Sequence, residues 1–539
     1  MKKENTVRVQ SDTSTLLHAL QATFTDHTKV LGELLQNGRR AKATRIDITV
    51  TDKAIVFADD GVGIEDPSVL LSVAKSGWDE GTMKDESPYG IGWLSCLFAC
   101  ETVSVQSKGK HLIAMTEDLL ALKPVVVNES AEIGVTEIRL LNHRLGSVDA
   151  IRHRIADLVA GFPIPVTLND EQLPRPSAID GSGDWIEGEV CLVRRNDALS
   201  FGHGAKYFLQ GLPISVGHRF TYGGSHPIHL KSPQVKGRLP ERDSVLEPDR
   251  VQKMLDRDAK RLAAEEAHRL AAEGRFDVLL THVDALLTLD LLHLLDGGGK
   301  FPQGLLAAVT ETPRNIAHEG IYSDSYMTDL ADQSLEGLHN SGKTIYVLDG
   351  CDTAEDLLGL HYVKAVDGLV LAATGLSVDR YIPWLERYAK VVRIEGADFT
   401  VTGVEQVGEG NVDLWDLKGV SLVKAVELSH PTFPSVRVTE AGVLCPTERV
   451  LFVAEGANAF EAACQCSDFL DEDERIDEAY RDRIVDELHL LMLEVFGAAE
   501  PEKLFAQVLS NCLKSLPSAV KGKTFTVTID AMGNHQVSC

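Results

Sequence analysis

This sequence of 539 residues lacks several features that would place it in a specialised class. It has no run of eighteen apolar residues and no basic and apolar segment at its start, so we expect neither a membrane span nor export. Its nine cysteines stand at irregular spacings and give no sign of a disulfide framework. We therefore expect a cytoplasmic protein whose domains depend on apolar cores.

Familiar catalytic and metal-binding patterns are missing too. Cys464 and Cys466 are one residue apart, and no second Cys or His pair follows at the spacing of a zinc site. Ser, His and Asp form no hydrolase elbow. Residues 337–344 satisfy the phosphate-loop pattern G-x-x-x-x-G-K-[ST], but a helix-like stretch precedes them and a strand-like run follows. Because that motif needs a strand before it and a helix after it, we interpret this match as a coincidental turn.

Basic residues are scarce. The chain has 53 Lys and Arg against 80 Asp and Glu, a formal net charge of −27. Binding to a nucleic-acid backbone requires basic side chains gathered on one surface, so this balance disfavours a general nucleic-acid clamp and leaves only local patches open. Residues 253–275 predict a helix with basic and acidic residues interspersed at helical spacing, which we interpret as an exposed, ion-paired face.

Three short motifs follow one another within the first hundred residues. In the first, residues 30–41, apolar residues recur at helical spacing, and Glu33 and Asn37 lie four apart on one face. A carboxylate can orient and deprotonate a water for attack on a phosphate, and a nearby amide oxygen can hold Mg²⁺. This face therefore has the groups that phosphate chemistry needs.

The second motif ends a predicted pair of strands. Residues 45–58 alternate apolar and polar side chains around a turn at residues 52–53, and Asp59 follows, with Gly61 and Gly63 close behind. An acid at the end of a strand can accept a hydrogen bond from an exocyclic amine, while bare glycine backbone lets a ring approach.

The third motif, residues 87–100, runs from a loop with Gly90 and Gly92 into an apolar helix. This geometry directs backbone N–H groups at an anion, because a helix N-terminus has unpaired donors and partial positive charge.

In their order and spacing the motifs resemble the nucleotide-binding domain of the GHKL superfamily, which includes type II topoisomerases, 90-kDa heat-shock chaperones, sensor histidine kinases and mismatch-repair ATPases. The resemblance implies a Bergerat sandwich of helices on a mixed sheet, and ATP and Mg²⁺ as ligands. It implies that Glu33 is the general base, Asn37 the magnesium ligand and Asp59 the acid that reads adenine. The remaining pocket residues that it implies are Gly61, Gly63, Lys75, Gly90, Ile91, Gly92 and Thr136.

The surrounding sequence is most similar to the 90-kDa heat-shock chaperones, notably at residues 74–77 and 89–95. Residues 206–214 and 239–243 are similar to their middle domain, where an arginine reaches the ATP. The resemblance implies that Arg242 meets the γ-phosphate and completes the catalytic site.

The chain departs from the chaperone pattern at three places. The loop from Ser76 to Gly90 is much shorter than the chaperone lid, which would reduce or alter closure over the nucleotide. Arg40 stands where the family usually keeps an acid. Asp60 occupies a position often held by Thr or Asn, which would alter the placement of water around the adenine.

We predict an α+β protein. Its expected parts are a Bergerat α/β sandwich ATPase domain at residues 1–175, an α/β middle domain at 176–297, a small α/β part at 298–426, and a smaller α+β C-terminal domain at 427–539. The helix expected at 471–496 has an apolar stripe, which is typical of a core face or of a dimer interface.

The expected function is that of a dimeric, ATP-driven clamp of the 90-kDa heat-shock type that acts on protein clients. Two alternatives stay open: a DNA-associated clamp of the topoisomerase or mismatch-repair type, and a nucleotide-sensing scaffold with little turnover because its lid is short. A histidine kinase is disfavoured, since no phosphoacceptor-helix pattern precedes the ATP motifs.

Overall fold

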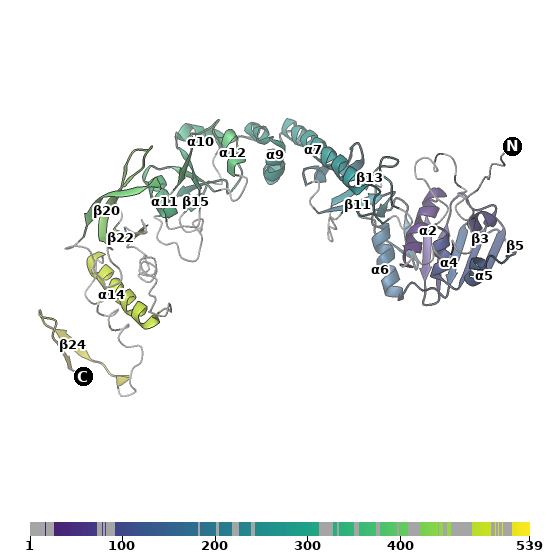
Figure 1. Ribbon diagram of the computed structural model, residues 1–539, viewed down its shortest axis with the longest axis horizontal. Helices are drawn as coiled ribbons and strands as arrows, with labels where there is room; N and C mark the ends of the chain where they lie inside the picture. Colours follow the sequence, from purple (N-terminus) through teal and green to yellow (C-terminus); the bar gives the residue numbers. More distant parts are fainter. Residues whose placement is uncertain are drawn as a thin grey trace, which may run out of the picture. The chain divides into compact units, whose positions relative to one another are not determined.

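A computed structural model gives the chain as two compact units, Met1–Leu291 and Leu292–Cys539. Figure 1 shows the elements of both units. The structure describes residues 17, 26–72, 78, 81, 92–179, 181, 184–200, 204–217, 226–238, 243–311, 327–330, 334–349, 355–372, 378–395, 398–407, 421–439, 441–445, 450–453, 477–496, 502, 505, 509 and 520–538.

The first unit begins with an eight-stranded sheet in the order β5-β4-β3-β6-β2-β1-β7-β8. Neighbouring strands are antiparallel except β1 and β7, which are parallel. The strands are β1 (Ile46–Val50), β2 (Ala54–Asp59), β3 (Thr102–Ser107), β4 (Lys110–Met115), β5 (Val127–Glu129), β6 (Thr136–Leu141), β7 (Val166–Leu168) and β8 (Glu171–Gln172).

Helices share one apolar core with this sheet. Leu31, Leu34 and Leu35 of one helix are almost fully buried in that core, together with Ile46 and Ile48 of β1. The helices are α2 (Lys29–Arg40), α4 (Leu94–Ala99), α5 (Thr116–Leu120), α6 (Val148–Val159) and the 3₁₀ helix η1 (Pro67–Leu71). Mixed strand directions under a layer of helices agree with the predicted Bergerat α/β sandwich.

A second sheet follows in the same unit, in the order β12-β11-β13-β10-β9. The predicted boundary at residue 175 lies between the two sheets. The strands are β9 (Trp185–Glu187), β10 (Cys191–Arg194), β11 (Ala205–Leu209), β12 (Leu212–Pro213) and β13 (His226–Leu230), and the helices are η2 (Arg195–Ser200), α7 (Pro248–Ala272), α8 (Phe276–Thr281) and α9 (Val283–Leu289).

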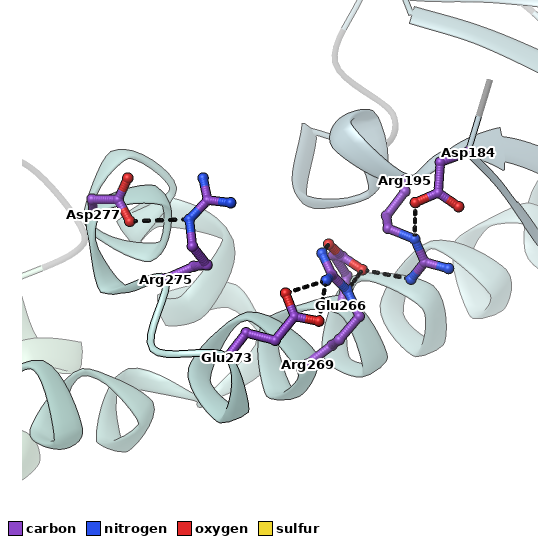
Figure 2. Close-up of polar contacts among 7 residues, drawn as sticks. All are labelled: Asp184, Arg195, Glu266, Arg269, Glu273, Arg275 and Asp277. Carbon is purple, nitrogen blue, oxygen red and sulfur yellow. Dashed lines mark hydrogen bonds and ion pairs between the residues drawn. The ribbon is translucent and has the colours of Figure 1, made fainter. Parts of the chain in front are cut away.

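Helix α7 packs against this sheet through buried carboxylates as well as apolar residues. Glu266 is only 3% exposed and accepts hydrogen bonds from Arg195 of η2 and from Arg269 one turn along α7, as Figure 2 shows. Asp258, also 3% exposed, accepts from the backbone N–H of Val190 at 2.8 Å. The prediction that the charges of this helix form an exposed face is therefore wrong for these two acids, which join α7 to η2 and to the residues just before β10.

The second unit has its own mixed sheet, in the order β15-β14-β17-β16-β18. The expected strand-like run after residue 344 forms β16, which pairs in parallel with β18. The strands are β14 (Leu306–Val309), β15 (Met327–Asp329), β16 (Ile345–Asp349), β17 (Leu369–Leu371) and β18 (Val391–Glu395), and the helices are η3 (Leu292–Gly298), α10 (Leu335–Ser341), α11 (Glu355–Ala365) and α12 (Val378–Leu385).

The phosphate-loop pattern at residues 337–344 lies in this unit. Helix α10 covers its first half, Gly342 ends the helix with a φ of 62°, and β16 follows. The helix thus begins two residues before the pattern, at Leu335, and continues into it. A helix followed by a strand is still the reverse of the order that a phosphate-binding loop needs.

A further antiparallel sheet, which the sequence did not predict, follows in the order β19-β20-β22-β23, with β21 paired to β20. The boundary predicted at residues 426–427 lies inside β20. The strands are β19 (Thr400–Gln406), β20 (Ser421–Ser429), β21 (Val436–Val438), β22 (Gly442–Cys445) and β23 (Val450–Val453). The described chain ends with a hairpin of β24 (Thr526–Ile529) and β25 (His535–Ser538).

Helix α14 (Glu478–Phe496) contributes its apolar stripe to the core of the second unit. Ile484 and Leu488 are buried there beside residues of β20, and Tyr480 is partly buried. Of the two interpretations of this stripe, the structure supports the core face. None of the helices in the described part of the chain is both long and apolar enough to cross a membrane.

Candidate functional site

Helix α2 presents the first motif. Glu33 and Asn37 are both half-buried, and their offset of four residues corresponds to about 6 Å along the helix axis, just over one turn. The side-chain oxygen of Asn37 accepts a hydrogen bond from Nη1 of Arg40 at 3.3 Å. Arg40 thus holds the amide of Asn37 from the next turn of the helix.

The glycine of the third motif lies directly against Glu33. A Cβ atom placed on Gly92 would lie 2.1 Å from Oε2 of Glu33 and 2.8 Å from its Cδ. Only a residue without a side chain therefore leaves space for this carboxylate. The Ser95 hydroxyl donates to the carbonyl oxygen of Gly92 at 2.6 Å and ties the glycine to the first turn of α4. The first and third motifs thus meet at Glu33.

Asp59 ends β2 and is 7% exposed. Its Oδ1 accepts a hydrogen bond from the backbone N–H of Gly61 at 3.0 Å. Burial raises the pKa of Asp59, and the neighbouring charge of Asp60 raises it further. The hydrogen bond from Gly61 acts in the opposite direction and lowers this pKa, but the net shift is upward. A Cβ atom on Gly38 of α2 would lie 3.5 Å from the Cβ of Asp59, so this acid lies close to the same helix as Glu33.

Asp60 points to a different part of the domain. Its oxygens accept from the backbone N–H groups of Thr44 at 2.6 Å and Arg45 at 2.9 Å, and from the hydroxyl of Thr44. The hydroxyl of Thr44 is the main cause that lowers the pKa of Asp60. These bonds assign Asp60 to holding the start of β1, a role that the sequence did not predict.

Thr136 lies opposite Asp59 in the sheet, because the two residues are partners in the pairing of β2 with β6. Its hydroxyl lies 2.9 Å from the hydroxyl of Ser107 at the end of β3. Ser107 also accepts from the backbone N–H of Ile64 at 2.9 Å. Three separate segments are therefore joined beside Asp59 by one buried hydroxyl pair.

Sequence reasoning missed Ser107, which is 1% exposed. A serine at the end of an otherwise buried strand is the one signal that was present, and it is weak because serine is common in strand ends and turns.

The loop after Asp59 is pressed against the end of α2. A Cβ atom on Gly61 would lie 2.6 Å from both the Cβ and the carbonyl oxygen of Ala41. That carbonyl accepts from the N–H of Val62 at 2.9 Å. Gly63 has a φ of 80°, in the left-handed region that favours glycine. The second motif therefore depends on glycine for a close backbone approach.

Replacing Gly61 with alanine should destabilise the first domain by about 1 to 3 kcal/mol, because the new methyl group would overlap backbone atoms that cannot move aside easily. Thermal unfolding of the purified chain would measure the effect. Gly32→Ala is the matched control, since its Cβ atom would lie at an ordinary 3.7 Å from Leu212 and alanine is favoured in a helix. Equal stabilities of the two variants would contradict this account of Gly61.

Four predicted site residues lie outside the described part of the chain: Lys75, Gly90, Ile91 and Arg242. The same holds for the short loop between Ser76 and Gly90, apart from Trp78 and Gly81. Their roles stay predictions.

Within the described residues, no group of three or more His, Cys, Asp and Glu side chains could hold a metal ion. Mg²⁺ prefers oxygen ligands and often takes only one or two from protein when phosphates and water supply the rest. The amide oxygen of Asn37 fits that limited role, because its bond from Arg40 is long at 3.3 Å and leaves a second lone pair for a ligand.

Comparison with protein families gives a match in the first unit. Residues 25–139 match the family model HATPase_c_3, described as histidine kinase-, DNA gyrase B-, and HSP90-like ATPase. No curated protein matched the chain. The matched residues include all of α2, β1 to β5 and the start of β6. The segment that holds Glu33, Asp59 and Thr136 is therefore similar to the ATPase domains of the GHKL superfamily, whose members bind ATP.

Proposed function

We propose that the chain is a GHKL-type ATPase that works as a homodimeric clamp on protein clients, most similar in organisation to the 90-kDa heat-shock chaperones. The observation that carries the proposal is the order of groups along α2. The carboxylate of Glu33 rests on Gly92, Asn37 follows one turn later, and Asp59 lies beside Gly38. Glu33 and Gly38 are separated by about 7.5 Å along the helix axis.

This order suits an adenine nucleotide that lies along the helix. Asp59 would accept a hydrogen bond from the exocyclic amine of the base, with Thr136 beside it in the sheet. Because Asp59 is buried, such a bond would be stronger than in water. The half-buried side chains of Asn37 and Glu33 would then face the phosphate end.

Hydrolysis would depend on Glu33, which can orient a water and accept its proton. Asn37 would hold Mg²⁺, which when bound neutralises charge on the phosphate oxygens. Gly92 leaves the space in which the carboxylate of Glu33 lies. The resemblance to the chaperones further supports Arg242 as the group that meets the γ-phosphate, and this role is a proposal.

A second candidate is a nucleotide-sensing scaffold with little turnover. One observation favours it: Arg40 donates to the oxygen of Asn37 that would hold the metal. A guanidinium at this place repels a divalent cation and competes for the same oxygen.

The decisive experiment measures ATP hydrolysis by the purified chain, alone and with unfolded protein or duplex DNA added in turn. We expect unfolded protein to change the rate and DNA to leave it unchanged, because the chain has a net charge of −27. Stimulation by DNA that weakens with salt would support a DNA clamp instead. Binding of ATP without hydrolysis would support the scaffold.

A further inference from the structure

An ion pair joins the helix of the site to the segment that follows the second sheet of the same unit. The Lys29 ammonium lies 3.1 Å from Oδ2 of Asp243. The Lys29 side chain is 16% exposed and that of Asp243 is 56% exposed, so the pair lies at the edge of a buried junction. Lys29 is the first residue of α2, and Asp243 lies between β13 and α7.

Lys29 belongs to the same helical face as the groups of the candidate site. Lys29, Glu33 and Asn37 are spaced by four residues, which places them in one row along α2. The ion pair therefore acts one turn, about 6 Å along the axis, before Glu33.

Asp243 is in turn held through its backbone by Ser215, close to β12 of the second sheet. Its carbonyl oxygen accepts from the N–H of Ser215 at 2.7 Å, and the carbonyl of Ser215 accepts from Val245 at 3.0 Å. Ser215 lies two residues after the end of β12 (Leu212–Pro213). A displacement of Asp243 would thus also displace the backbone next to that strand.

Apolar packing supports the same junction. Leu212 of β12 packs against the first domain's core, and its Cδ1 lies 3.7 Å from where a Cβ atom on Gly32 would stand. Phe208 of β11 fills the space beside Gly161, where a Cβ atom would lie 2.3 Å from its ring. The first turns of α2 are therefore contacted both by the charge of Asp243 and by the apolar side chain of Leu212 of the second sheet.

A second carboxylate lies near Lys29. Burial would raise the pKa of Asp26, while hydrogen bonds from Thr28 and the charges of Arg154 and Lys29 lower it below its ordinary value. A negative side chain at position 29 would therefore be repelled by two acids, Asp26 and Asp243.

We propose that Lys29 is a positioning residue for ATP hydrolysis, whose ion pair with Asp243 holds the second sheet against α2 and keeps the row that contains Glu33 in its working position. This inference rests on the proposed ATPase function. It makes the second sheet a support of the catalytic helix, so that movement of that sheet changes turnover more than nucleotide binding.

The test compares Lys29→Glu with the exchanged pair Lys29→Glu/Asp243→Lys. We expect Lys29→Glu to lower kcat by about three- to tenfold, in line with the modest strength of partly exposed pairs, while the Kd for ATP changes by less than about twofold. The exchanged pair should recover most of the rate, and the remaining deficit reflects Asp26. Lys53→Glu, in the exposed turn between β1 and β2, changes the charge equally and should match wild type.

Failure of the exchange to restore kcat, or an equal loss in Lys53→Glu, would overturn the inference while leaving the ATPase intact. If wild type and Glu33→Ala hydrolyse ATP equally, the proposed function fails instead. Hydrogen exchange then still tests the junction: Lys29→Glu should speed exchange in the peptides that contain the amides of Ser215 and Val245. Unchanged exchange there would overturn the inference without reference to activity.

Discussion

Asp59→Asn is expected to weaken ATP binding by about 10- to 100-fold, because a hydrogen bond to a charged acceptor contributes roughly 1.5 to 3 kcal/mol. The amide retains an oxygen that can accept from Gly61, so the loop should keep its shape. The asparagine lacks the negative charge that, in this buried position, would accept a hydrogen bond from the exocyclic amine of adenine. Isothermal titration calorimetry with ATP would measure the change.

Asp60→Asn is the matched control, with the same chemical change one residue away. Because Asp60 holds Thr44 and Arg45 and is exposed, its loss should cost stability and leave ATP affinity within about twofold of wild type. Undiminished affinity in Asp59→Asn would refute the assignment of Asp59 to the base.

ATP affinity should depend on pH through the carboxyl group of Asp59. The pKa of Asp59 is raised by burial, so its carboxyl takes up a proton at a higher pH than an exposed aspartate does. ATP affinity should therefore be full above this raised pKa and fall as the pH falls through it, and Asp59→Asn should lose that dependence.

The stability of the ligand-free chain should respond in the opposite sense. A carboxyl with a higher pKa in the folded state favours folding most when it is protonated, and this advantage is lost as the pH rises through that pKa. At neutral pH, Asp59→Asn should therefore unfold at the same temperature as wild type or at a higher one. A lower unfolding temperature would show that the charge of Asp59 serves the fold.

Glu33→Ala should lower the rate of ATP hydrolysis by about 10²- to 10⁴-fold, the usual contribution of a positioned general base. ATP affinity should change little, because Glu33 would contact the attacking water and not the base or ribose. Steady-state hydrolysis at saturating ATP gives the first quantity, and calorimetry gives the second. If ATP binding is lost together with hydrolysis, Glu33 has a structural role and is not the general base.

Gly92→Ala offers a finer version of the same experiment. Its new methyl group would overlap the end of the Glu33 side chain, which can rotate away at small cost to stability. The carboxylate would remain but lie elsewhere, so we expect normal folding with a rate between those of wild type and Glu33→Ala.

The parts of the fold that could be predicted from sequence are those with local patterns. Apolar residues at helical spacing predicted α2, and strict alternation predicted β1 and β2 with their turn. The pairing of Asp59 with Thr136 joins residues far apart in the chain, so no local pattern contains it. The resemblance supplied Thr136, but nothing in the sequence linked Ser107 to it.

Other features stayed hidden because one pattern fits two structures. Acids interspersed among bases on α7 give the same sequence pattern whether they face water or pack against another element. Glu266 is buried because it pairs with Arg195, which belongs to another element and is distant in the sequence. The apolar stripe on α14 is likewise equally compatible with packing in the core and with packing against a partner subunit. Only the presence of β20 in the same core shows which surface it covers.

The pairing of β2 with β6 has a consequence for how this chain can change by insertion or deletion. Thr136, Ile138 and Leu140 point to the buried side of β6, while Arg139 is exposed. A shift of β6 by one residue in its pairing with β2 would exchange the two sides, so Arg139 would enter the core and Thr136 would leave its place opposite Asp59. Insertions and deletions that shift this pairing should therefore prevent the first domain from folding.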